Sequence, residues 1–190
     1  MSAPGLPDVG NLPLALAGLG LSWVEAGQLI VVSEEAPIAA WGHFAGGGDV
    51  VVINPRVLTW RPGVLALVIK HELLHYAAYG TAYAGQPNKA AMNLALDVAV
   101  NHILQAVHPG DFAGLARLVY GKMEGDSPVL LAAGPKATVS GRWQALHQEV
   151  WGSGQTPSPL LLYYKLHHQV RDEALDLGFG GYACPCAGQG

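Results

Sequence analysis

The sequence is poor in cysteine and in charge, and each shortage excludes a class of protein. Its 190 residues include only two cysteines, Cys184 and Cys186, which is too few for a disulfide framework. Charged residues make up 13%, and the ten lysines and arginines form no basic run that would bind nucleic acid. The 51% of hydrophobic residues excludes a wholly disordered chain, and the length suits a single domain.

Long apolar runs and an early positive charge are also lacking. No uninterrupted apolar stretch reaches the ~18 residues of a membrane span, so no membrane partner is expected. The apolar stretch 12–21 is not preceded by a basic residue, since the first one is Arg56. A secretory signal begins with positive charge, so the expected location is the cytoplasm. The apolar composition is compatible with a homodimer.

The order of the predicted elements is that of an α+β domain. A short first helix is expected to start near Asn11. Glycines 46–48 indicate a hairpin between two predicted strands of a small, mostly antiparallel sheet. The predicted strands are 29–33, 37–44 and 49–54. The later predicted helices are 62–80, 87–107, 111–120 (capped by Asp111), 141–151 and 158–177. Residues 1–180 should form one domain, followed by a flexible tail at 181–190.

The strongest chemical signal is the segment His71-Glu72-Leu73-Leu74-His75. Residues four apart lie on one face of a helix, so the two imidazoles can bind one metal ion. Zinc suits neutral imidazole and leaves a coordination position open for catalysis. Glu72 lies about 100° round the helix from His71, where it can act as general base on a water molecule. The alternative is that both histidines are ordinary core residues.

A catalytic zinc needs a third protein ligand, and the next predicted helix offers Asp97. Asn93, Asp97 and Asn101 recur every four residues and form one polar stripe on an apolar helix. We expect the stripe to face the metal, with Asp97 as ligand and the two asparagines supporting it. The alternatives are a stripe that faces solvent, or His102 or His43 as the third ligand.

Three segments together resemble the zincin-like metallopeptidase domain that occurs N-terminal to von Willebrand A-like domains in bacterial proteins. They are INPRVL (53–58), HELLH (71–75) and MNLALDVAVN (92–101), with a weaker similarity at SPLLLYYKL (158–166). The resemblance implies a zincin-like fold and assigns His71, His75 and Asp97 to the metal and Glu72 to catalysis.

The sequence also departs from that family. No von Willebrand-like segment follows within the 190 residues. The family often has a histidine or arginine soon after the motif, whereas here only Lys89 follows, late in the stretch. Tyr76, Tyr79 or Tyr83 could stabilise the oxyanion instead. A metzincin would have glycine and histidine where this chain has Ala78 and Thr81.

The sequence therefore predicts a zinc-dependent peptidase that acts on a peptide or protein substrate. The substrate would lie antiparallel to an edge strand near 37–44, and His43 could lie beside the cleft. Two alternatives stay open: a catalytically silent zinc-binding interaction module of zincin fold, and a zinc amidohydrolase that acts on a non-peptide amide.

Overall fold

The computed structural model describes residues 10–21, 30–44, 48–82 and 85–170. The predicted tail at 181–190, with both cysteines, lies outside these residues, as do 171–177 of the last predicted helix. The elements, in chain order, are α1 (Leu12–Gly18), β1 (Ile30–Val32), β2 (Ala39–Phe44), β3 (Gly48–Ile53), η1 (Pro55–Val57), α3 (Pro62–Ala82), α4 (Lys89–Val107), α5 (Pro109–Val119), η2 (Pro128–Ala132), η3 (Gly141–Trp143), α6 (Gln144–Gly152) and α7 (Pro159–Leu166). The α+β class is confirmed.

The three described strands form one mixed sheet in the order β1-β3-β2. The hairpin of β2 and β3 is antiparallel, as the glycines predicted, but β1 pairs with β3 in parallel. The sheet is therefore mixed: the expected antiparallel pairing holds for the hairpin, with six residue pairs, but not for β1, with three. The cause is the strand order. The chain reverses between β1 and β2 and again between β2 and β3, so β1 and β3 run the same way, and β3 occupies the centre.

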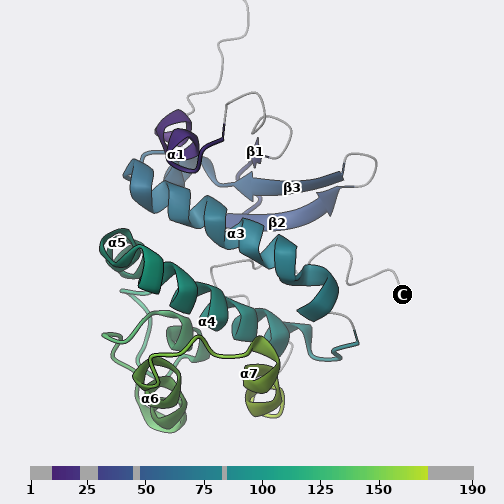
Figure 1. The fold of residues 1–190 in the computed structure, drawn as a ribbon, viewed down its shortest axis with the longest axis vertical. Coiled ribbons are helices and arrows are strands. Elements are labelled where there is room, and N and C mark those ends of the chain that lie inside the picture. The colour runs from purple at the N-terminus through teal and green to yellow at the C-terminus, as the bar shows by residue number, and fades with distance from the viewer. Residues whose placement is uncertain (1–9, 22–29, 45–47, 83–84, 171–190) are drawn as a thin grey trace, which may run out of the picture.

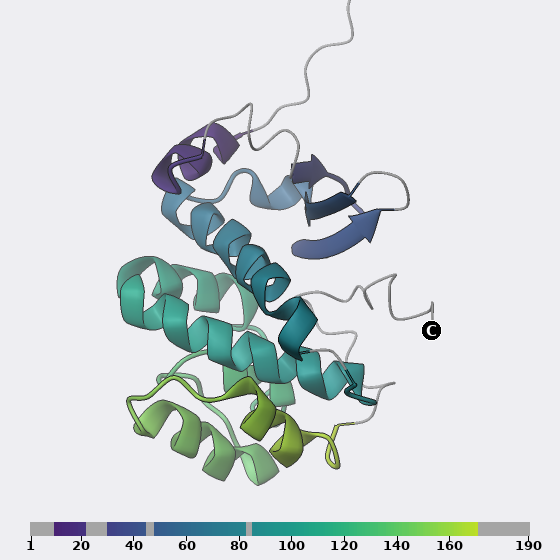
Figure 2. The ribbon, with the colours of Figure 1, turned by 45° about the vertical axis from the view of Figure 1, so that its right-hand side comes forward.

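The elements are stacked in layers, with the sheet at one end and the last helices at the other (Figure 1). Helix α3 packs on β2 and β3, α4 packs on α3, and α7 packs on α4. The turned view keeps the same order, with α3 between the sheet and α4 (Figure 2). Helix α3 is therefore enclosed, with the sheet on one side and α4 and α5 on the other.

This enclosure explains why α3 is apolar on nearly all sides, as the sequence predicted. All six residues from Val64 to Ile69 are buried, because neighbouring elements cover every face of this segment. They belong to one large core that also contains residues of the sheet and of every later helix. The other face of the sheet buries only a small cluster around Ala36, Ala40 and Val52. The main core is therefore built around α3 and α4.

Several helix boundaries differ from the prediction, most of them by one to three residues, and two of the differences have identifiable reasons. Asp111 does not cap α5, since that helix already begins at Pro109 and Asp111 lies in its first turn. There it accepts a 2.9 Å hydrogen bond from Arg61. Helix α7 ends at Leu166 rather than near 177. Asn88 Nδ2 donates to the carbonyls of His167 and Val170, which holds the chain in a turn beyond the helix.

Helix α4 is the single described helix that is long and apolar enough to cross a membrane by length and composition. In this structure 67% of its apolar window is buried inside the protein. Its first turn is fixed by Asn88, whose Oδ1 accepts from the backbone N–H of Ala91 at 2.9 Å. Its apolar character is that of a helix in the centre of a core.

Candidate metal centre

The two histidines of the motif and one aspartate converge between α3 and α4. His71 and His75 lie one turn apart on α3, and their ring centroids are 4.7 Å apart. Asp97 extends toward them from α4. Its Oδ1 lies 3.1 Å from Nε2 of His71 and 2.9 Å from Nε2 of His75. One carboxylate oxygen therefore faces two ring nitrogens at once.

This group is removed from solvent. The exposed fractions are 1% for His71, 6% for His75 and 4% for Asp97. Nε2 of His75 is a buried nitrogen with no hydrogen-bond partner, because its 2.9 Å approach to Asp97 lacks hydrogen-bond direction. A buried polar atom without a hydrogen bond is costly, which calls for a ligand at this point.

The surrounding side chains fix which nitrogen of His71 carries a proton. Asn101 donates its amide Nδ2 to the hydroxyl of Tyr120 at 2.9 Å, so its Oδ1 is the acceptor. That oxygen lies 3.1 Å from Nδ1 of His71, and Nδ1 must therefore donate. Nε2 faces Oδ1 of Asp97 at 3.1 Å and hydrogen-bonds to it, and it is the nitrogen that would bind a metal ion in place of that contact. A hydrogen bond of this kind on the far nitrogen is typical of metal-binding histidines.

The electrostatics of the group favour a negative charge on Asp97 and a positive charge beside it. Burial alone would lower the pKa of His75, but the Asp97 and Glu72 carboxylates outweigh burial and raise it. Burial alone would raise the pKa of Asp97, but His71 and His75 together lower it. Asp97 is thus held as the carboxylate, with positive charge favoured beside it. A metal ion supplies such positive charge without a proton.

The three residues fit a metal ion by their atom types and their spacing. Two imidazoles and a carboxylate form the donor set of many catalytic zinc sites. Bonds of about 2.0–2.1 Å at tetrahedral angles would separate two ligand atoms by roughly 3.3 Å. The separations of 2.9 and 3.1 Å are close to that value, and all the ligand atoms lie within 4.8 Å of one another. The group could therefore bind a metal ion.

Glu72 lies beside this group and contacts the sheet. Its exposed fraction is 5%, and Oε2 accepts a 3.0 Å hydrogen bond from the backbone N–H of Trp41. Trp41 is on β2, the strand at the edge of the sheet. The carboxylate of the motif therefore lies between the metal group and an edge strand.

The remaining sequence candidates have separate positions. Asp97 and Asn101 are buried against α3, so the solvent-facing alternative is wrong for these two residues. Asn93 is half-buried, and its Nδ2 donates to Oδ2 of Asp97 over a long 3.4 Å. His102 is not part of the group, because its ring stacks on Trp151 at 4.9 Å. Tyr76 is exposed and lies 5.4 Å from the ring of Trp41. The side chains of His43 and Tyr79, and all of Tyr83, lie outside the described residues.

Two residues of this site were not expected from the sequence. Tyr120 accepts from Asn101 and so belongs to the chain of hydrogen bonds from His71, and burial raises its pKa well above the usual value. Trp41 contributes its backbone N–H, and a backbone donor has no signature in the sequence. A tyrosine at the end of a predicted helix could have been noted, but nothing in the sequence placed it near Asn101.

Comparisons with known proteins add no relative: no protein-family model matches the chain, and neither a curated protein nor a solved structure matches it.

Proposed function

We propose that the protein is a zinc-dependent peptidase whose metal is held by His71, His75 and Asp97. The proposal includes a zincin-like relationship, for which the support is the motif and the polar stripe in the sequence. The observation that carries it is the convergence of two ring nitrogens on one carboxylate oxygen in a buried site. A buried Glu72 directly follows the first of these histidines on the same helix.

The donor set favours zinc among the common divalent metals. Imidazole nitrogens suit zinc, whereas magnesium and calcium prefer oxygen ligands. With three protein ligands, one coordination position stays open for water or substrate. When bound, the metal would polarise a carbonyl group and make a water molecule more acidic.

Glu72 has the role of general base in this proposal. It takes the proton of the attacking water and later passes it to the leaving amine. The N–H of Trp41 orients the carboxylate through Oε2 and leaves Oε1 for the proton. Tyr76 is one candidate to stabilise the oxyanion, since it is exposed and follows His75 directly.

The edge position of β2 supports a peptide substrate over a small amide. An extended peptide can add to an edge strand through backbone hydrogen bonds, and specificity then comes from alternate side chains. The outer edge of β2 is next to Glu72, as the 3.0 Å contact from Trp41 demonstrates. A peptide that pairs with the part of β2 beyond Trp41, whose N–H is taken by Glu72, would bring its backbone to the general base.

A metal-binding module without hydrolytic activity is the second candidate, and the environment of Glu72 favours it. A carboxylate that is almost fully buried and hydrogen-bonded to the sheet could serve only to join α3 to β2. A zinc amidohydrolase that acts on non-peptide amides is the third, but no feature of the site favours it over a peptidase.

The first test measures metal per chain by elemental analysis after purification without chelator. Wild type, His75→Ala and Asp97→Ala are compared with His168→Ala, which removes an exposed histidine outside the group. We expect about one zinc per chain in wild type and His168→Ala, and loss of zinc from the other two variants. Failure of the wild type to hold or take up zinc would refute the metal site.

The second test measures cleavage of a peptide library by the zinc-loaded protein. Glu72→Gln keeps the size of the side chain and should retain zinc but lose cleavage by roughly 100-fold or more. Equal cleavage by wild type and Glu72→Gln would refute the role of Glu72. Zinc binding without any cleavage would favour the interaction module.

A further inference from the structure

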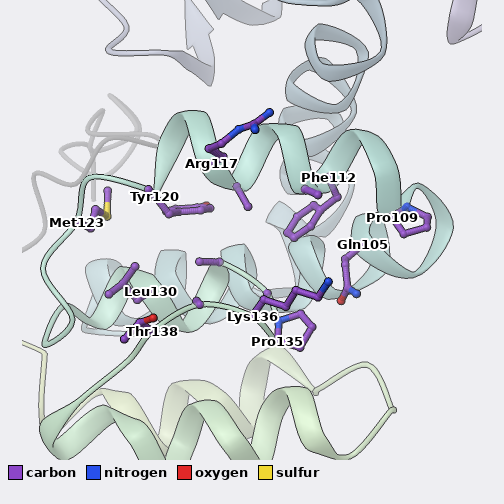
Figure 3. A pocket seen from close by; sticks show the side chains of 16 residues that line it. Gln105, Pro109, Phe112, Arg117, Tyr120, Met123, Leu130, Pro135, Lys136 and Thr138 are labelled. Carbon is purple, nitrogen blue, oxygen red and sulfur yellow. The ribbon is translucent and has the colours of Figure 1, made fainter.

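Contacts from the candidate metal group run in two directions, toward a cavity beside α5 and toward the sheet. The cavity has a volume of about 510 Å³, and Tyr120 lines it (Figure 3). Neither the metal-binding residues nor Glu72 line this cavity, and the buried Asn101 and Tyr120 link it to His71 through side-chain hydrogen bonds. On the sheet side lie Glu72 and the exposed Tyr76. The position of the Glu72 carboxylate therefore depends on the sheet side.

The backbone N–H of Trp41 is available to Glu72 because of its place in the hairpin. Asn54 N–H donates to the carbonyl of Ile38 at 2.8 Å, and hydrogen-bonded pairs alternate with non-hydrogen-bonded pairs along an antiparallel ladder. Three positions after Ile38, Trp41 faces Val51 in a non-hydrogen-bonded pair. Its N–H therefore points away from β3, to the edge where Oε2 of Glu72 accepts it at 3.0 Å.

Helix α3 contacts Trp41 a second time, through the ring of Tyr76. The centroids of the two rings are 5.4 Å apart and the ring planes are tilted by 44°, which is within the range in which aromatic side chains attract each other. Glu72 and Tyr76 are four residues apart, so they lie on one face of α3, one turn from each other. Two residues of α3 therefore hold one residue of β2, by a hydrogen bond to its N–H and by a contact with its side chain.

We propose that Tyr76 is a positioning residue that fixes the Glu72 carboxylate through Trp41. The ring of Tyr76 has this role rather than its hydroxyl, because the contact with Trp41 is between rings. Without the ring, Trp41 would be held less firmly and its hydrogen bond to Glu72 would open more often. Within the proposed function, on which this role rests, Glu72 is the general base, so its carboxylate would be aligned with the attacking water for a smaller fraction of the time.

The first test measures hydrogen exchange of the Trp41 amide by NMR, in the full chain with and without zinc. Tyr76→Ala removes the ring and should speed this exchange by roughly 2- to 10-fold, as the contribution of an aromatic pair implies. Tyr76 is 48% exposed, so the variant should still fold. Tyr76→Phe keeps the ring and should exchange at the wild-type rate. Tyr164→Ala is the matched control, because it removes another exposed tyrosine, from α7, and should change nothing at Trp41.

The amide of Ala40 is the internal reference, because Ala40 faces Val52 in a hydrogen-bonded pair of the same hairpin. General loosening of the hairpin would speed exchange at Ala40 and Trp41 equally, whereas loss of the ring contact should act mainly on Trp41. The proposal would be overturned by unchanged exchange of Trp41 in Tyr76→Ala, by equal acceleration of both amides, or by a Tyr76→Phe protein that behaves like Tyr76→Ala.

The second test measures the kinetics of peptide cleavage by the zinc-loaded variants. Tyr76→Ala should lower kcat by a similar factor of roughly 2–10 and leave KM nearly unchanged, because the position of the base affects the chemical step. Tyr76→Phe should retain the wild-type kcat. An unchanged kcat in Tyr76→Ala would overturn the positioning role, and an equal loss in both variants would assign the effect to the hydroxyl and overturn it as well. A wild type that cleaves no peptide would refute the peptidase, while the exchange rates would still decide whether Tyr76 fixes Glu72 through Trp41.

Discussion

Replacement of Asn101 by alanine should weaken metal binding although Asn101 is not a ligand. Its Oδ1 accepts from Nδ1 of His71 at 3.1 Å, and its Nδ2 donates to Tyr120 at 2.9 Å. The side chain is fully buried, so water cannot easily take its place. Without it, the orientation of the ring and the position of its proton are no longer fixed.

The magnitude follows from the role of such supporting residues. Loss of the hydrogen bond to a metal-binding histidine lowers affinity by roughly 10- to 100-fold. Free zinc at 100 times the wild-type dissociation constant stabilises the wild type by about 2.7 kcal/mol. At the same zinc concentration the variant would gain only about 0.4–1.4 kcal/mol. At about 2–4 °C per kcal/mol, the zinc-dependent rise in Tm falls from about 5–11 °C to about 1–6 °C.

The assay is thermal unfolding followed by circular dichroism, with chelator and with buffered zinc. The metal-free variant should also be less stable by about 1–3 kcal/mol, because a buried hydrogen-bond network is broken. Asn93→Ala is the comparison, since its contact with Asp97 is the longer 3.4 Å and its side chain is only half-buried. A folded Asn101→Ala protein with the wild-type zinc response would refute the assignment of the proton to Nδ1 of His71.

Three further results are expected. The zinc-dependent rise in Tm should be larger at pH 8 than at pH 6, because the carboxylates raise the pKa of His75 and a proton there competes with the metal. The stability of the chelated wild type should fall relative to His147→Gln as the pH drops from 7.5 to 5.5 in urea titrations. Burial lowers the pKa of His147, so the unfolded chain binds a proton there before the folded chain does, from about pH 6.5 downward. A difference in the free energy of unfolding between the two proteins that stays constant with pH would contradict this. Asn88→Ala should cost about 2–3 kcal/mol in the same titrations, because it removes a helix cap and two hydrogen bonds to the turn after α7. Ser158→Ala is its control, since Ser158 makes no side-chain cap at α7 and should be nearly neutral.

The convergence of His71, His75 and Asp97 could be predicted because it depends on helical periodicity. Spacings of four place the histidines on one face and align Asp97 with the asparagines, and a polar stripe on an apolar helix must face something polar. The predicted bounds of α3 and α4 were accurate to two residues because these helices are long, and one begins at a proline and the other after a capping asparagine. Helix α3 nevertheless continues through Gly80, where it was predicted to end.

The errors arose where contacts distant in the sequence decide the outcome. Aspartate is a residue type that often caps helices, so Asp111 was predicted to cap α5. Its hydrogen bond with Arg61, fifty positions earlier, could not be foreseen from the sequence. The turn after α7 depends on Asn88, which is 79 positions before His167. The order of the strands likewise depends on the packing of the hairpin. Of the two adjacent tyrosines of α7, Tyr163 is buried and Tyr164 is 58% exposed, and the sequence does not distinguish them.

The hydrogen bond from Trp41 to Glu72 also has a consequence for self-association. An edge strand offers unpaired N–H groups to other chains, and proteins protect such edges with charges, bulges or covering segments. Here a carboxylate from α3 occupies the Trp41 donor on β2. Glu72 therefore protects part of this edge from pairing with a second copy of the sheet. A Glu72→Ala chain would expose that donor and should aggregate more readily at high concentration, even with its metal ligands intact.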